Sequence, residues 1–302
     1  MKINWYPGHM HKTRKLISEA MAKVDVVLEV LDARLPQASG NPLLRSLRRG
    51  KPCIKLLAKE DLADPKITRV WLQTLEKEKG VKALAIDARN AKHAVKICKL
   101  CRTLAPHRGT GGRPIRVMVV GIPNVGKSTI INLLVGRKVA QVGNKPAVTK
   151  IPQLVDLKNG IVVNDTPGLL WPNLEDQTGA YCLAASGAVG ENAMDYLEVG
   201  LFAVDYLRNQ YPTLLNSRYG SVDLAAAPDQ LLEQIGRIRG CLISGGEVDQ
   251  RKTAELLLRE LRGGKIGRIS LEIPAEKRSE NNPPQGAAET PRGEGKGNDD
   301  TA

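Results

Sequence analysis

The stretch GIPNVGKST, residues 121–129, constrains the fold of this chain more than any other feature. It lies between the apolar run 115–120 and a helix-forming segment, and the pattern G-x-x-x-x-G-K-[ST] is complete from Gly121 to Ser128. Such a loop places backbone N–H groups around phosphates at a helix N-terminus, while its lysine neutralises the β and γ phosphates and its hydroxyl binds Mg²⁺. The motif therefore predicts a phosphate site. Its residues are Asn124, Val125, Gly126, Lys127, Ser128 and Thr129, with Lys127 also serving catalysis.

Segments typical of buried strands alternate with helical segments over the first half of the chain, which predicts a mainly parallel α/β sheet. The strand candidates are 24–32, 52–58, 81–87, 115–121, 151–157 and 161–168. From about Gln177 onward only helical patterns follow. We therefore predict a nucleotide-binding domain over 1–176 with a basic segment at 1–22, a helical RNA-binding domain over 177–272, and a disordered tail rich in Pro, Gly, Asn and Glu over 273–302.

Two motifs after the loop indicate the GTPase class. NDTPG ends a strand candidate at Asp165, whose carboxylate would support the Mg²⁺ shell, and the N–H of Gly168 would sense the γ phosphate. Between the two motifs, NKPAVTK offers Thr149 as a switch residue that closes over Mg²⁺ and takes part in catalysis. The predicted ligands are therefore GTP or GDP with Mg²⁺.

A base-binding motif precedes the phosphate loop instead of following it. LAKEDLAD (57–64) resembles N-K-x-D: Asp61 can accept hydrogen bonds from N1–H and the 2-amino group of guanine, and Lys59 would lie over the ring. Ala58 replaces the usual Asn, which predicts weaker affinity, and IDARN (86–90) would supply backbone around Ala88. If the linker 106–114 joins the former last helix to the former first strand, the fold is a circularly permuted Ras-like P-loop GTPase domain with a C-terminal all-α domain.

Charge and cysteine content limit the partners and the compartment. The formal net charge is +13, and thirteen Lys and Arg with no acidic residue lie between Ala88 and Val155, which favours contact with nucleic acid. No apolar run approaches the roughly 20 residues of a membrane span, so a cytoplasmic protein without a membrane partner is expected. Cys98 and Cys101, with His93 and His107 nearby, suggest zinc, but their helical spacing favours simple packing.

The motif order, together with WYPGHMHKT at the N-terminus, LDARLP after the first strand and DTPGLLWP, resembles the ribosome biogenesis GTPase A (YlqF-like) family over about residues 1–272. The resemblance implies a GTPase that acts in late maturation of the large ribosomal subunit, contacts ribosomal RNA, and has a low intrinsic rate raised by the particle. A monomer is expected. A GTP-gated regulator of a protein or transfer RNA partner is the alternative.

Two further residues have open roles. Ras-like enzymes orient the attacking water with a Gln after the DxxG glycine, but Leu169 and Leu170 stand here. The resemblance implies that His9 in WYPGHM acts in hydrolysis, whereas an N-terminal His more often contacts RNA or packs. Asn124 either coordinates K⁺ between the α and γ phosphates, as in related PN-GKS loops, or only braces the loop.

Overall fold

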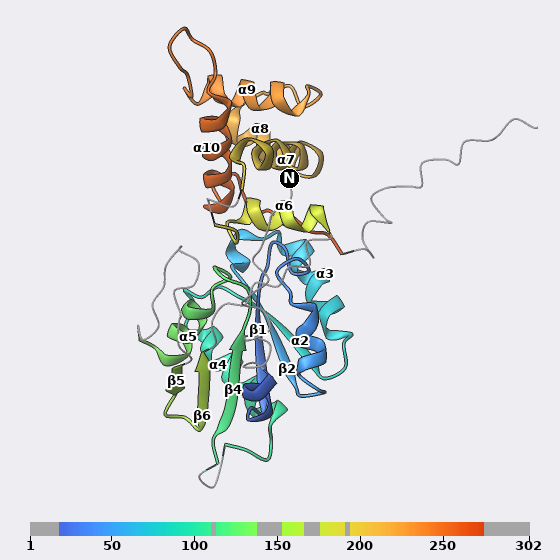
Figure 1. Ribbon diagram of the computed structural model, residues 1–302, viewed down its shortest axis with the longest axis vertical. Coiled ribbons are helices and arrows are strands. Elements are labelled where there is room, and N and C mark those ends of the chain that lie inside the picture. The colour runs from blue at the N-terminus through green and yellow to red at the C-terminus, as the bar shows by residue number, and fades with distance from the viewer. Residues whose placement is uncertain (1–17, 110–112, 138–152, 166–175, 191–193, 275–302) are drawn as a thin grey trace, which may run out of the picture.

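A computed structural model describes residues 18–109, 113–137, 153–165, 176–190 and 194–274 (Figure 1). Its centre is a six-stranded sheet in the order β3-β2-β1-β4-β6-β5. All neighbouring strands are parallel except β5, which pairs antiparallel with β6. The phosphate-loop strand β4 lies next to β1, near the middle of the sheet.

The strands are β1 (Val26–Asp32), β2 (Cys53–Ala58), β3 (Val81–Ile86), β4 (Ile115–Val120), β5 (Gln153–Asp156) and β6 (Ile161–Asp165). The helices that accompany them are α2 (Pro42–Leu47), the 3-10 turn η2 (Glu60–Leu62), α3 (Pro65–Glu76), α4 (Lys92–Leu104) and α5 (Lys127–Val135). Farther along the chain lie the helices α6 (Gln177–Ser186), α7 (Tyr196–Gln210), α8 (Pro212–Tyr219), α9 (Pro228–Ile238) and α10 (Gln250–Arg262).

Helices cover both faces of the sheet, as the apolar character of its strands requires. Every residue of β1 is buried, and alternate side chains enter different clusters. Leu28 and its neighbours on one face pack with α4 and α5, whereas Val27 and Leu31 on the other face pack near α2 and α3. The helices occupy the two faces of the sheet, so the loops that follow the parallel strands lie at its carboxyl edge.

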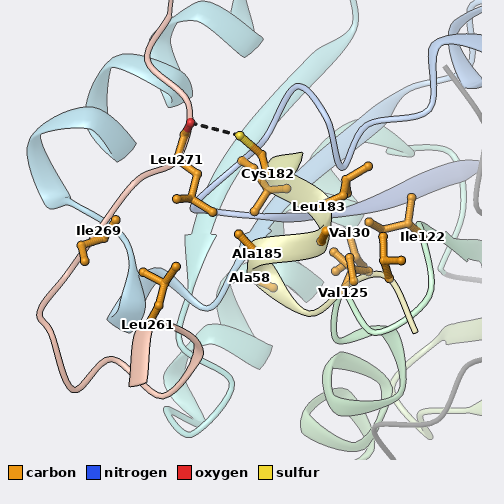
Figure 2. Packing of buried hydrophobic residues seen from close by; sticks show 14 of the residues in the cluster. Val30, Ala58, Ile122, Val125, Cys182, Leu183, Ala185, Leu261, Ile269 and Leu271 are labelled. Atoms are coloured by element: carbon orange, nitrogen blue, oxygen red, sulfur yellow. Dashed lines mark hydrogen bonds between the residues drawn. The ribbon is translucent and has the colours of Figure 1, made fainter. Parts of the chain in front are cut away.

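Helices α6–α10 are stacked over one end of the sheet (Figure 1). One hydrophobic cluster runs from Val30 and Val125 beside the phosphate loop, through α6, to Leu261 and Leu271 (Figure 2). Cys182 of α6 lies in this cluster, where its Sγ donates to the carbonyl oxygen of Leu271 at 3.4 Å. The helical part therefore shares apolar core with the sheet, and the division at residue 176 stays a prediction.

Each of the six strand candidates contains an observed strand. Helix α2 ends at Leu47, and helix α7 begins after Asp195, whose side chain accepts from the N–H of Glu198. Helix α8 was not predicted as a separate element; Pro212 begins it, because proline is well tolerated in a first helical turn. No helix in the described ranges is long and apolar enough to cross a bilayer.

Candidate nucleotide-binding site

The phosphate loop connects β4 to α5 with an unusual backbone. Gly121, Asn124 and Gly126 have φ angles of +155°, +57° and +110°, values that L side chains rarely adopt. A Cβ at Gly121 would lie 2.5 Å from the carbonyl oxygen of Val30 in β1. Glycine is therefore required where the loop leaves the sheet, and this curvature lets successive N–H groups face a common centre.

The loop lysine is buried at the start of α5. Lys127 is 7% exposed, and its Nζ donates to the carbonyl oxygen of Ile122 at 2.9 Å across the loop. Val125 packs into the core, whereas Ser128 and Thr129 in the first helical turn are partly exposed. A buried ammonium beside open hydroxyl groups at a helix N-terminus suits a polyphosphate with its metal ion.

The base-binding loop begins where β2 ends. Lys59 has a left-handed backbone, with φ +61°, and its Nζ donates to the carbonyl oxygen of Asn124 at 3.1 Å. The side chain thus bridges the base-binding loop and the phosphate loop across the end of β1. A Cβ at Gly126 would lie 3.8 Å from the Cβ of Ala58, so the position where Asn was expected also faces the phosphate loop. Lys59 supplies a connection despite the missing Asn.

A buried ion-pair network fixes the position of the Lys59 side chain. Asp32 ends β1 and accepts from Lys59 Nζ at 2.9 Å and from Arg34 Nε at 2.9 Å. Burial alone would raise the pKa of Asp32, but the charges of Arg34 and Lys59 hold that pKa below its usual range. Arg34 is 2% exposed, and its Nη2 also donates to the carbonyl oxygen of Ser186 in α6. The network links the nucleotide loops to the helical part.

The proposed guanine-reading carboxylate already has a partner. Asp61 lies in the turn η2, and its Oδ2 is 2.9 Å from Nη2 of Arg89. Arg89 also binds Asp87, and both belong to the loop after β3 that contains Ala88. This contact places the loop that contains Ala88 next to the base-binding loop, and the role of Ala88 at the base stays a prediction. It also means that a base which takes both carboxylate oxygens of Asp61 must compete with Arg89.

The predicted metal ligands are only partly within the described residues. The β4–β6 register pairs Val119 with Asp165, so Asp165 ends its strand beside the phosphate loop that carries Ser128. The assignment of Ser128 and Asp165 to Mg²⁺, a hard cation that prefers oxygen ligands, stays a prediction. His9, Thr149 and Gly168 lie outside the described residues, and their assignments stay predictions.

Zinc finds no support in the described part of the chain. Cys98 and Cys101 are buried in α4, and burial raises the pKa of both thiols, that of Cys101 to about 12. Zinc binding needs the thiolate form. No group of three or more His, Cys, Asp or Glu able to hold a metal occurs within the described ranges. The two cysteines are core residues.

A phosphate loop near the centre of this sheet, with a base-binding loop joined to it by Lys59, defines a P-loop GTPase. In agreement, residues 116–218 match the family described as 50S ribosome-binding GTPase. The chain is 43% identical over 284 residues to ribosome biogenesis GTPase A of Priestia megaterium, covering 91% of this chain and 98% of the relative. The Thermotoga maritima protein of the same name is 32% identical, with 91% and 95% covered.

Two solved structures of YlqF are also similar to this chain. A GDP-bound structure of TM YlqF has a TM-score of 0.62 and 29% identity, over 86% of this chain and 99% of that one. GNP-bound YlqF from T. maritima has a TM-score of 0.61 and 28% identity, over 87% and 99%. The chain belongs to the ribosome biogenesis GTPase A family.

Three residues of this site were not predicted from sequence. Asp32 and Arg34 occur in LDARLP, which was noted only as part of the resemblance, although an Asp at the end of a buried strand is a usable signal. Arg89 had no local signal, because an exposed arginine in a loop is common.

Proposed function

We propose that the protein is a GTP-hydrolysing assembly factor that acts in late maturation of the large ribosomal subunit. GTP hydrolysis and a role in ribosome assembly follow from its family. The observation that carries the proposal is the contact between Lys59 and Asn124, which joins base-binding and phosphate-binding loops into one site. The proposal has three finer parts. The ribosomal particle that the protein binds is the large subunit, the intrinsic rate of GTP hydrolysis is low, and binding to the particle raises that rate.

The residues of the site have distinct proposed tasks. Lys127 would neutralise the β and γ phosphates through its Nζ, a three-donor ammonium that donates to the carbonyl oxygen of Ile122. Mg²⁺, when bound, neutralises charge that develops on the phosphates. Ser128, Asp165 and Thr149 would hold it, Gly168 would sense the γ phosphate, and His9 would orient the attacking water. Lys59 and Asp61 would bind guanine, with Ala88 at its edge.

Circular permutation explains the order of the motifs. The sheet order places β1 directly beside β4, and β2, which leads into the base-binding loop, lies on the other side of β1, although β1 and β2 both precede β4 in the chain. The linker 106–114 would therefore connect the last helix of a conventional GTPase domain to its first strand. This arrangement puts the helices α6–α10 directly after the second switch, so that the helical domain is coupled to nucleotide state.

The charge distribution supports RNA as the direct contact. Lys92, Lys96, Lys99 and Arg102 follow one another on α4 at helical spacing, and all four are exposed. None of them forms an ion pair with another described residue. An unneutralised basic face of this kind suits a phosphate backbone.

Sedimentation with ribosomal particles tests the proposed partner. With a GTP analogue bound, the protein should co-sediment with large subunits more strongly than with GDP, and added salt should weaken binding steeply because phosphate contacts release counterions. Changing Lys92, Lys96 and Lys99 to Gln should lower the salt dependence, whereas changing Arg251, which pairs with Glu255, should not. Binding to transfer RNA or to a protein alone would favour the alternative function.

Nucleotide exchange tests the base assignment. Asp61→Asn should weaken GTP binding and favour xanthosine triphosphate, because the amide can donate where the carboxylate only accepts. A wild-type protein that bound ATP as well as GTP would contradict the assignment. Ala58→Asn should tighten GTP modestly or leave it unchanged.

Two turnover measurements test the remaining roles. Faster hydrolysis in K⁺ than in Na⁺ would assign Asn124 to a cation site, and equal rates would leave it as a brace of the loop. His9→Ala should lower particle-stimulated turnover while GTP affinity and particle binding stay near wild type; unchanged stimulated turnover would refute the role of His9.

A further inference from the structure

The segment that follows the last helix lies directly against the base-binding loop. Arg268 donates from Nη2 to the carbonyl oxygen of Glu60 at 2.7 Å and from Nε to that of Ala63 at 3.0 Å. The next residue, Ile269, donates its N–H to the carbonyl oxygen of Leu62 at 2.8 Å. Three hydrogen bonds from two consecutive residues therefore join the segment Gly267–Leu271, here called the strap, to the loop that contains Asp61.

The strap is itself held by the helical part of the protein. Ile269 and Leu271 are buried in the cluster shared with α6 and α10 (Figure 2). The carbonyl oxygen of Ser270 accepts from the hydroxyl groups of Tyr206 and Tyr211 at 2.9 and 3.2 Å. Because packing and hydrogen bonds both restrain it, the strap is a firm support for whatever it contacts.

A second support reaches the same loop from its other side. Lys59 is fixed by Asp32 and by the carbonyl oxygen of Asn124, and Arg34 orients Asp32. The backbone of Arg34 in turn accepts from the N–H of Leu271 at 2.6 Å. The strap thus supports the base-binding loop directly, through Glu60–Ala63, and indirectly, through Arg34.

The loop needs such support because of its backbone. Lys59 adopts a left-handed conformation, which costs a non-glycine residue about 1–2 kcal/mol. Asp61 follows in a 3-10 turn of only three residues, whose geometry is weakly determined by local sequence. The direction of the Asp61 carboxylate therefore depends on the carbonyl groups before and after it, and these are the groups that the strap binds.

We propose that the strap positions the base-binding loop for guanine and that Arg268 is its positioning residue. The inference rests on the proposed role of Asp61. Arg268 acts through the backbone on either side of Asp61, because its side chain donates to the carbonyl oxygens of Glu60 and Ala63. Because coupling between sites is reciprocal, a bound guanine base should also stabilise the strap and, through it, the helical part.

Discrimination between GDP and inosine diphosphate tests the proposal. Inosine lacks the 2-amino group, so the ratio of the two affinities measures how well Asp61 is aimed, while general loss of structure weakens both nucleotides alike. Arg268→Ala should lower this ratio roughly three- to tenfold. Arg268→Lys should restore part of it, since an ammonium can still donate. Arg259→Ala, an exposed arginine of α10, is the matched control and should leave the ratio unchanged.

The variant Asp61→Asn distinguishes a failure of the proposed strap role from a failure of the proposed role of Asp61. If Asp61→Asn lowers the ratio and Arg268→Ala does not, the strap has no positioning role. If neither change lowers it, Asp61 does not read the base, and both the site assignment and the strap inference are wrong.

Hydrogen exchange on the wild-type protein gives an answer even if Arg268→Ala fails to fold. GDP should slow exchange of the Ile269 amide, which donates to Leu62, more than inosine diphosphate does. The amide of Asp249, which donates to Cys241 in the turn before α10, is the internal control. Equal protection of the Ile269 amide by both nucleotides would overturn the proposal.

Discussion

Replacing Gly121 with Ala probes the point where the phosphate loop leaves the sheet. The new Cβ would lie 2.5 Å from the carbonyl oxygen of Val30 and 3.1 Å from Cγ1 of Val125. Both neighbours are buried, and Val30 belongs to the central strand β1, so neither can move away cheaply. Steric overlap of this kind costs about 1–3 kcal/mol. The φ of +155° adds a backbone cost of about 1–3 kcal/mol.

Together the two effects predict a loss of about 2–6 kcal/mol in the free energy of unfolding, a large share of the roughly 5–15 kcal/mol typical of a domain. Urea denaturation measures the loss, and titration with GDP measures the expected weakening of binding as the loop shifts. Gly136→Ala is the matched control: its φ is +71°, but no atom lies within 4 Å of the new Cβ. It should cost only about 1–2 kcal/mol. Equal urea midpoints for the two variants, together with normal GDP binding by Gly121→Ala, would contradict the expected steric clash at Gly121.

Three further predictions concern charge and metal. Hydrogen bonds from Arg218 hold the pKa of Glu260 at about 2, below the ordinary 4.5, so its stabilisation is complete above pH 4.5 and is lost as pH falls toward 2. Glu260→Gln should remove this acid dependence and cost about 2–4 kcal/mol at neutral pH, measured by urea denaturation; an unchanged acid profile would contradict it. Arg89→Ala should tighten GDP binding by freeing Asp61, and weaker binding in a titration would instead assign Arg89 a supporting role. A zinc chelator should leave the Tm unchanged, because the two cysteines of α4 are buried core residues, and a lower Tm would reopen the zinc hypothesis.

Motifs that are continuous in the chain were predictable with their chemistry. The phosphate loop is one such motif, since Gly121 to Ser128 carry the turn, the charge and the helix start in eight successive residues. The base-binding loop was also predictable, because Lys59 and Asp61 follow a recognisable buried strand. Alternation of strands and helices fixed the fold class for the same reason, as each element buries its own apolar pattern.

Only the tertiary structure decided how these loops are held. The contact between Arg268 and Glu60 joins residues 208 positions apart, and nothing in the sequence near either one signals the other. The pairing of Asp61 with Arg89 depends on β2 and β3 lying side by side with their carboxyl ends at one edge. Local propensity acts over a few residues, whereas these contacts arise when the packed core brings distant segments together. The sequence by itself therefore determined the fold class, the phosphate-loop motif and the candidate base-binding loop, and the packing of the strap and the sheet decided which residues contact these loops.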